Sequence, residues 1–178
     1  LVSIQTFEPS DVYTYSGEFV IDNVNETVSQ PVLNNRDHPY ANGTQYKTVL
    51  KHPIIVSQEH KDFKYEDVAI VEFNPTPNQF YDVVVIDAST DLKEWKQLDI
   101  YDAERFPVWT AVYNLGAAAA INDDLFKEQS IDLLNFFEEG DEIVIRFRLI
   151  SDPFVTSFGW AIRSINPSAA TEVVEEDE

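Results

Sequence analysis

The sequence predicts an all-β protein, built as a two-sheet antiparallel β-sandwich of the jelly-roll type. About eight or nine short apolar segments are separated by turn residues, and no segment shows a regular helical periodicity. The nine prolines are spread among segment ends, where a sheet tolerates them. With 44% hydrophobic residues, the 178-residue chain can bury a substantial core and is expected to form one folded domain.

Two segments near the C-terminus carry the clearest strand pattern. From Glu142 to Ile150, apolar side chains alternate with polar ones, which is typical of a strand with one face in a core. From Phe158 to Ile165, the side chains of Trp160 and Ile162 share one face of a second strand. We expect these two strands to close the core of the sandwich.

Further strands are expected along the chain. Tyr81 to Ala88 is the most apolar run and predicts a central strand buried on both faces, with Trp95 to Ile100 as its hairpin partner. Asn25 to Thr44 is long and polar, so it is predicted to be a loop. The other expected strands are a short edge strand within Leu1 to Thr6, Glu18 to Val24, Tyr46 to Ser57 with a bend at Pro53, and Asp67 to Phe73.

Three segments give weaker patterns. Pro107 to Tyr113 is a short segment around Trp109, in which no helix is expected. Leu115 to Ile121 is predicted to be a loop, because its run of alanines lies between turn-forming residues. Phe126 to Leu134 fits helix and strand patterns about equally.

The domain organisation follows from these segments. Residues 1–17 are expected to form a lead-in or edge strand, residues 18–168 the β-sandwich module, and residues 169–178 an acidic linker or tail. Methionine is absent from the chain, including at residue 1, so we expect it to be a piece of a longer protein.

The composition excludes several classes of partner. The chain has 32 acidic and 12 basic residues, a formal charge of -20, and therefore repels nucleic acid and anionic membranes. No run approaches the roughly 18 to 20 apolar residues that span a bilayer, so no membrane insertion is expected. The absence of cysteine excludes disulfides, thiolate metal sites and a cysteine nucleophile. The acidity itself has two interpretations, which are a solubility feature or oxygen ligands for Ca²⁺.

No arrangement of residues indicates catalysis. His38, His52 and His60 are scattered and form no pair at metal-ligand spacing. A serine-hydrolase elbow and a phosphate-binding glycine loop are both missing, and nothing singles out one pair of carboxylates for glycoside hydrolysis. We therefore expect that the protein is not an enzyme.

Calcium is the expected cofactor, in a structural role. Glu18, Asp22 and Asp37 lie at strand ends or in loops, where carboxylates and backbone carbonyls can converge on one ion, and Asp123 and Asp124 lie in a similar position. No segment matches the spacing of an EF-hand loop, so a site would be assembled from distant segments. The alternative is that each of these carboxylates is a solvated surface charge.

A ligand-binding platform is the second candidate site. Tyr101 and Trp109 lie in a loop-rich region together with Arg105, an arrangement that suits the stacking of a sugar on aromatic rings with a polar neighbour. The alternative is that these aromatic rings belong to the core or rim of the sandwich, which is their more frequent place.

Several pieces of the sequence, in this order, resemble a family. They are Leu50 to Ile54, Val68 to Glu72, Tyr81 to Val85 with Trp95, Val108-Trp109, Ile131 to Leu134, Gly140 to Leu149, Ser151-Asp152-Pro153 and Gly159-Trp160-Ala161-Ile162. The pattern is similar to jelly-roll modules of large secreted and cell-surface proteins of Bacteroidetes, often exported by the type IX secretion system. A wider kinship is with MAM-like domains and with modules of immune inhibitor A type metalloproteases.

The resemblance implies a non-catalytic accessory domain, which calcium stabilises in some relatives. The family commonly closes with Gly-Trp-x-Ile-Asp-Asn, whereas this chain has Arg163 and Ser164 at the last two positions. A cation at Arg163 therefore argues against a metal at that point.

These observations together predict an accessory module of a secreted or cell-surface multidomain protein, serving adhesion or the binding of a ligand such as a glycan. Its partners would be a glycan or protein at the cell surface and other domains of the same chain. The alternative is a structural or protein-docking unit of a surface or secretion assembly.

Overall fold

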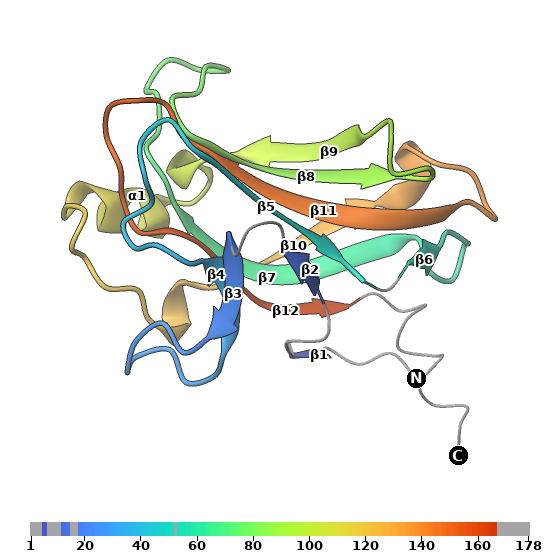
Figure 1. The fold of residues 1–178 in the computed structure, drawn as a ribbon, viewed down its shortest axis with the longest axis horizontal. Helices are drawn as coiled ribbons and strands as arrows, with labels where there is room; N and C mark the ends of the chain where they lie inside the picture. The colour runs from blue at the N-terminus through green and yellow to red at the C-terminus, as the bar shows by residue number, and fades with distance from the viewer. Residues whose placement is uncertain (1–4, 7–11, 15–17, 52, 167–178) are drawn as a thin grey trace.

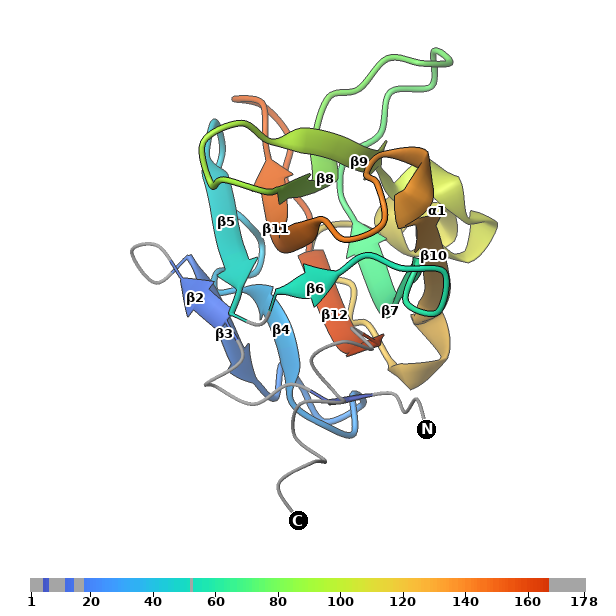
Figure 2. The same cartoon turned by 90° about the vertical axis from the view of Figure 1, so that its right-hand side faces the viewer.

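The protein is a mostly-β sandwich with one short α-helix (Figure 1). The computed structural model describes residues 5–6, 12–14, 18–51 and 53–166. Two antiparallel sheets pack face to face, so the predicted fold class is confirmed. Figure 2 shows the two sheets as separate layers when the molecule is viewed from one end.

The first sheet has the strand order β10-β7-β12-β4-β3, and β1 also pairs with β12. The strands are β1 (Gln5–Thr6), β3 (Phe19–Asp22), β4 (Val32–Asn35), β7 (Asp62–Ile70), β10 (Lys127–Asp132) and β12 (Gly159–Asn166).

The second sheet has the strand order β2-β5-β11-β8-β9, and β6 also pairs with β11. The strands are β2 (Val12–Thr14), β5 (Gln45–Leu50), β6 (Ile54–Ile55), β8 (Val83–Ser89), β9 (Lys96–Tyr101) and β11 (Glu142–Ile150). The predicted strand from Tyr46 to Ser57 is thus two strands, β5 and β6, which both pair with β11.

The connections between the sheets have the jelly-roll pattern. From β4 onwards the chain crosses repeatedly between the sheets, so that β4, β7, β10 and β12 lie in one sheet while β5, β6, the hairpin β8–β9 and β11 lie in the other. The last two strands, β11 and β12, each pair on both sides and occupy the middle of their sheets. This confirms the predicted jelly roll and the role of these strands in closing the core.

Aromatic side chains fill the space between the sheets. On β11, Ile143, Ile145, Phe147 and Leu149 are all buried, and the residues between them are more exposed, as the alternation predicts. The ring of Phe147 meets that of Trp160 edge-to-face, with 5.4 Å between centroids. The whole of β8 is buried, which confirms a central strand covered on both faces.

Two segments differ from the prediction. Pro107–Asn114 forms the α-helix α1, although its β-branched and aromatic residues gave no helical pattern. Proline suits the start of a helix, because the N–H that it lacks would have no partner inside the helix. Asn25 to Thr44 contains β4, where the side chains of Asn34 and Asn35 are buried and hydrogen-bonded rather than solvated as in a loop.

The ambiguous segment Phe126 to Leu134 contains β10, followed by the 3₁₀ turn Leu133–Asn135. Two further 3₁₀ turns are Ala103–Arg105 and Asp123–Leu125. The sandwich extends over the described part of the proposed module, and the predicted acidic tail, residues 169–178, lies outside the described residues. The described helices are all too short to span a bilayer.

Candidate metal site

The structure separates the three carboxylates predicted to hold calcium. Glu18 Oε1 accepts a hydrogen bond from the backbone N–H of Lys47 (2.7 Å), and Asp22 Oδ1 accepts one from Asn34 Nδ2 (2.9 Å). Asp37 Oδ2 accepts one from the Tyr46 hydroxyl (3.1 Å). Each carboxylate therefore has its own partner, and the three are not brought together as one group in the described part of the chain.

The second acidic pair is not brought together as a metal site either. Asp123 Oδ1 accepts a hydrogen bond from the backbone N–H of Ser29 (3.1 Å) and lies 3.8 Å from the guanidinium of Arg163. The guanidinium of Arg163 is therefore a cationic neighbour of the Asp123 carboxylate. Asp124 is exposed on the adjoining 3₁₀ turn.

The predicted aromatic platform is part of the core. Trp109 is 0% exposed and its Nε1 donates to the carbonyl of Leu125, while Tyr101 is 3% exposed. Arg105 lies over the Tyr101 ring at 4.0 Å and forms an ion pair with Asp99 (2.7 Å). The two rings thus pack against other side chains, as the alternative interpretation held, and neither presents a flat face to a ligand.

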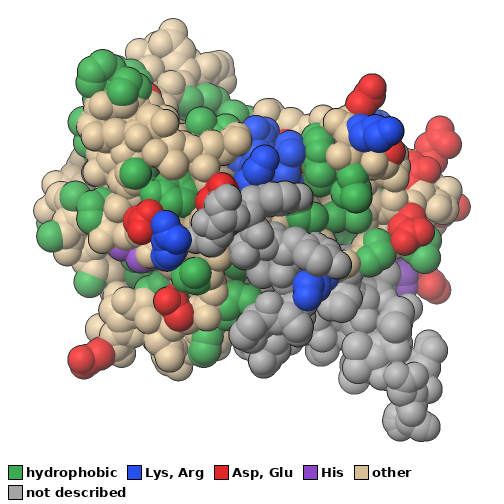
Figure 3. All heavy atoms as spheres, viewed as in Figure 1, with side chains coloured by type: hydrophobic (Ala, Val, Ile, Leu, Met, Phe, Trp, Pro, Cys, Tyr) green, Lys and Arg blue, Asp and Glu red, His purple; other side chains and the backbone are tan. Residues whose placement is uncertain are grey.

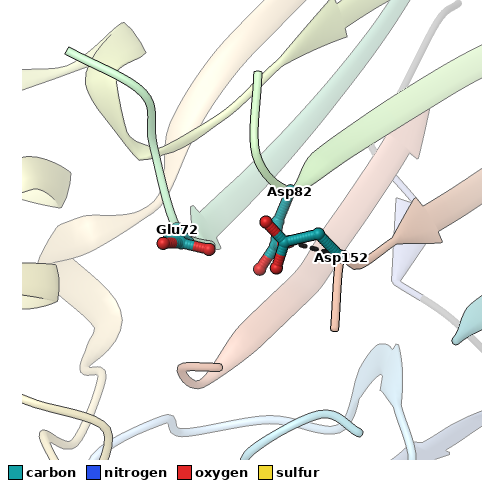
Figure 4. Close-up of side chains that lie close together, drawn as sticks. All are labelled: Glu72, Asp82 and Asp152. Carbon is teal, nitrogen blue, oxygen red and sulfur yellow. Dashed lines mark hydrogen bonds between the residues drawn. The ribbon is translucent and has the colours of Figure 1, made fainter. Parts of the chain in front are cut away.

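A different acidic group comes together at the end of the sandwich where β7 and β11 finish and β8 begins. Glu72 follows β7, Asp82 directly precedes β8, and Asp152 follows β11. Their ligand oxygens lie within 4.8 Å of one another, and no other such group of three occurs among the described residues. Figure 4 shows the three side chains converging from separate segments.

Asp82 connects the three segments at this site. Its Oδ1 accepts a hydrogen bond from the backbone N–H of Asp152 (2.7 Å), and its Oδ2 accepts one from the Tyr40 hydroxyl (2.5 Å). The same hydroxyl accepts from the backbone N–H of Glu72 (3.1 Å), and the backbone N–H of Asp82 donates to the Glu72 carbonyl (3.3 Å). Because Asp82 is completely buried, these contacts fix its carboxylate firmly.

One oxygen of the Glu72 carboxylate lacks a hydrogen-bond partner among the described residues. Glu72 is only 9% exposed, and its Oε1 is buried with no hydrogen bond among the described residues. Burial, together with the charges of Asp152 and Asp82, raises the pKa of Glu72 to about 7. A buried oxygen without a partner beside two other carboxylates is unfavourable by itself, and a cation or a proton would offset this cost.

Burial also raises the pKa of Asp82 to about 6, although the hydrogen bonds from Tyr40 and from the Asp152 backbone oppose this shift. Two neighbouring carboxyl groups thus resist ionisation for the same reason, which is that negative charge is concentrated out of water. A bound cation would remove this cost for both groups at once.

The geometry fits a metal ion. Two oxygens that bind one Ca²⁺ at about 2.3–2.6 Å can lie no more than about 5 Å apart. The separation of up to 4.8 Å between the three carboxylates meets this condition. The buried triad of Glu72, Asp82 and Asp152 could therefore hold a metal ion, with further ligands from water or backbone carbonyls.

The sequence contained a partial signal for this site. Asp82 and Glu72 border a proline-containing connection between two predicted strands, and Asp152 lies in the turn after the clearest strand. What the sequence could not provide is which strand ends meet, because β7 lies in one sheet and β8 and β11 lie in the other. The sequence analysis looked for carboxylates at strand ends, and the group that the structure brings together differs from the predicted Glu18, Asp22 and Asp37.

Comparison with models of known protein families gives no match, and a search of curated proteins gives no significant match. The fold and the site therefore define the class of the protein. It is a jelly-roll β-sandwich with a buried carboxylate triad suited to a metal ion.

Proposed function

We propose that this chain is a non-catalytic accessory module of a secreted or cell-surface multidomain protein, which binds a ligand and is stabilised by Ca²⁺ at Glu72, Asp82 and Asp152. The observation that carries the proposal is the orphaned, buried Oε1 of Glu72 facing two further carboxylates. The family resemblance, in which some relatives are stabilised by calcium, supports the same assignment.

Calcium suits this ligand set better than the alternative metals. All three side-chain ligands are carboxylates, and hard cations prefer oxygen, whereas zinc sites usually contain histidine or cysteine. Magnesium requires near-ideal octahedral geometry, which three side chains from two separate connections do not readily supply. An ion of charge +2 would also offset part of the -20 formal charge.

The role of the ion would be to hold the loops rigid. Glu72 and Asp82 lie in the connection between β7 and β8, and Asp152 lies in the connection between β11 and β12, so one ion would join two long connections across the two sheets. Binding modules place ligand contacts on loops that a rigid scaffold positions. Calcium at this end would therefore pre-organise a surface without taking part in bond-breaking.

A protein-docking unit is the second candidate function, favoured by exposed apolar residues in the same two connections. Phe80 and Tyr81 are 41% and 47% exposed just before Asp82, and Phe154 and Val155 are 75% and 46% exposed just after Asp152. Large apolar residues on a surface often mark a protein contact. If the chain is a protein-docking unit, the ion holds the two connections that form the docking surface, and no glycan binds.

The test of the proposal is a thermal melt in excess chelator and again in millimolar Ca²⁺, with Mg²⁺ as a second cation. A ligand that binds only the folded state stabilises it by about 2.7 kcal/mol at a hundredfold excess over its dissociation constant. We expect a clear rise in midpoint with Ca²⁺ and a smaller one with Mg²⁺.

Two variants locate the ion. Glu72→Gln keeps the shape of the side chain but removes the charge, so it should abolish the calcium-dependent rise. Glu59→Gln removes an exposed carboxylate elsewhere and should leave the rise unchanged. Equal rises in the wild type and in Glu72→Gln, or no rise in the wild type, would refute a calcium site at the triad.

A further inference from the structure

Four segments that reach the end of the sandwich beside the carboxylate triad contain no charged residue. They are residues 39–46, 73–81, 106–122 and 153–162. Over the whole chain 25% of the residues are charged, and the connections β6–β7, β8–β9 and β10–β11 at the opposite end each contain two or more charged side chains. The absence of charge is therefore a property of one end, and we call the surface that these four segments form the uncharged face.

Contacts between the segments hold the uncharged face together. The backbone N–H of Tyr40 donates to the carbonyl of Ser157 (3.1 Å), which joins the connection β4–β5 to the connection β11–β12. The ring of Phe73, in the connection β7–β8, meets that of Tyr113 on α1 edge-to-face at 5.3 Å. Figure 1 shows α1 and these connections at the same end of the two sheets.

Large apolar side chains are exposed on this face. Among the described residues, six of the eight exposed large hydrophobic side chains belong to it, and Leu115 is 78% exposed. The six are Phe80, Tyr81, Val108, Leu115, Phe154 and Val155. Figure 3 shows hydrophobic side chains at the upper left of the molecule, with few charged ones among them. An exposed apolar surface of this kind marks a contact site, because its burial is favourable.

The charged residues next to these segments are largely paired or buried. Arg36 forms an ion pair with Asp37 (3.5 Å), and Arg105 forms one with Asp99 (2.7 Å). Two of the three triad carboxylates lie beneath the surface, in residues that are 9% and 0% exposed. Protein interfaces have the same anatomy, which is an apolar centre depleted in charge within a polar border.

The distribution of charge limits what this face can bind. A basic partner would be attracted to the acidic remainder of the surface, which carries the formal charge of -20, rather than to a face without charge. An acidic partner or an anionic lipid surface would be repelled. A charged contact surface would also lose its hydration against apolar side chains without gaining an ion pair. The occupant is therefore apolar and uncharged where it makes contact.

We propose that the uncharged face binds the same face of a second copy of the chain, so that the protein forms a two-fold dimer. An apolar face is complementary to itself, and a two-fold contact brings the same patch of both subunits together. Pairing through other surfaces would bring acidic side chains of the two copies together. The dimer is one form of the protein-docking role proposed above, on which it rests, and it does not require the metal ion.

Sedimentation equilibrium of the chain over a range of concentrations tests the dimer, in saturating Ca²⁺ and again in chelator. We expect a reversible monomer–dimer equilibrium in both. The dissociation constant should fall at least about fivefold when NaCl rises from about 0.15 M to about 1 M, because the screening length between the two acidic chains shortens from about 8 Å to about 3 Å. Salt weakens a contact between opposite charges, so the direction of the change separates an apolar dimer from an ion-paired one.

Variants assign the contact to the uncharged face. Leu115→Gln and Phe154→Gln should each raise the dissociation constant at least about tenfold, because each removes an exposed apolar side chain from the contact. The matched control is Leu92→Gln in the connection β8–β9 at the opposite end, where the leucine is 60% exposed, and it should change the constant less than about twofold. Thermal melts of the diluted monomers check that all three variants fold.

Three results would overturn the proposal. The first is a chain that stays monomeric at every concentration and salt, and the second is an equal effect of Leu92→Gln and Leu115→Gln. The third is a monomer that co-sediments with phosphatidylcholine vesicles, which would assign the face to a lipid surface. A dimer without any calcium-dependent rise in melting temperature would reject the metal and keep the face. A monomer that calcium stabilises would do the reverse.

Discussion

The hydroxyl of Tyr101 on β9 donates a hydrogen bond to the carboxylate of Asp67 on β7, which is completely buried between the two sheets. Asp67 also accepts hydrogen bonds from Trp160 Nε1 (2.8 Å) and Gln129 Nε2 (3.0 Å). The Tyr65 hydroxyl lies 2.9 Å from that of Tyr101. A single carboxylate thus joins the two sheets through donors on three strands, and this network explains why Tyr101 points inward.

Removing the Tyr101 hydroxyl should destabilise the fold. Tyr101→Phe leaves the ring in place but deprives a buried carboxylate of one donor, and hydrogen bonds to charged groups contribute about 1.5–3 kcal/mol. We expect the free energy of unfolding to fall by about 2–3 kcal/mol in urea denaturation. Tyr81→Phe, at a residue that is 47% exposed, is the matched control and should have almost no effect. Equal effects of the two changes would show that the network does not stabilise the fold.

Asp67 should also make stability depend on pH. Burial raises the pKa of Asp67 from 3.8 to about 6, although its three donors oppose the shift. The folded state therefore binds the proton more tightly than the unfolded state, and the contribution of this group to stability is lost as pH rises through about 4 to 6. Between about pH 5 and pH 7.5 the loss amounts to about 1.4 kcal/mol.

The pKa values of Glu72 and Asp82 are also raised, to about 7 and about 6, so these groups contribute to the pH dependence of stability as well. The contribution of Asp67 is therefore isolated by comparing the unfolding free energy of Asp67→Asn with that of the wild type. The amide does not ionise, and the difference in unfolding free energy should therefore shift in favour of the variant by about 1.4 kcal/mol over that interval. Urea denaturation in chelator at the two pH values checks this. A difference that stays constant, or that moves in favour of the wild type, would mean that the pKa of Asp67 is not raised.

The sequence predicts most strands correctly because the spacing of its apolar residues shows which side chains of a strand are buried. The alternation on β11 and the continuous apolar run of β8 gave their strands and their burial. Periodicity fails where polar side chains are buried together with their hydrogen-bond partners. Asn34 and Asn35 look like loop residues, yet their amides are satisfied inside the first sheet. Trp109 lies on a helix of only two turns, which is too short for a clear period.

The sequence indicates which type of residue could form a metal site, but it does not indicate which of these residues lie together. The sequence analysis considered acidic residues at strand ends, and Asp82 and Asp152 belong to that class. Which strand ends meet depends on how the chain passes between the sheets, and one sequence does not report that order. The burial that raises the pKa of Glu72 is equally a property of the assembled loops.

Gly159, the first residue of β12, has a conformation that only glycine adopts easily, and its substitution should be severely destabilising. Its φ is +114°, and a Cβ there would overlap the side chain of Asn35, whose Oδ1 accepts from the Trp160 backbone N–H (2.7 Å). Gly116 has a similar φ of +109° but has nothing within 4 Å of the added carbon. Gly116→Ala should therefore cost only the backbone strain of about 1–2 kcal/mol.

Gly159→Ala should cost that strain and the loss of the Asn35 contact, about 3–5 kcal/mol in total. Chemical denaturation of both variants measures the difference. Similar losses for the two would show that Asn35 moves aside without penalty and that the close approach is not required by the fold.

The charge of Glu72 should have opposite effects on stability without and with calcium. In chelator at about pH 8, above its raised pKa of about 7, the ionised carboxylate lies beside two others, so Glu72→Gln should raise the free energy of unfolding by about 1–2 kcal/mol. In saturating Ca²⁺ the wild type gains roughly 2–3 kcal/mol that the variant lacks, so the variant should then be less stable than the wild type by about 1 kcal/mol. Urea denaturation under the two conditions detects this inversion, and Glu59→Gln should be neutral in both. A variant that is less stable than the wild type under both conditions would mean that Glu72 supports the loops through contacts of its own, and the charge repulsion inferred at the triad would then be wrong.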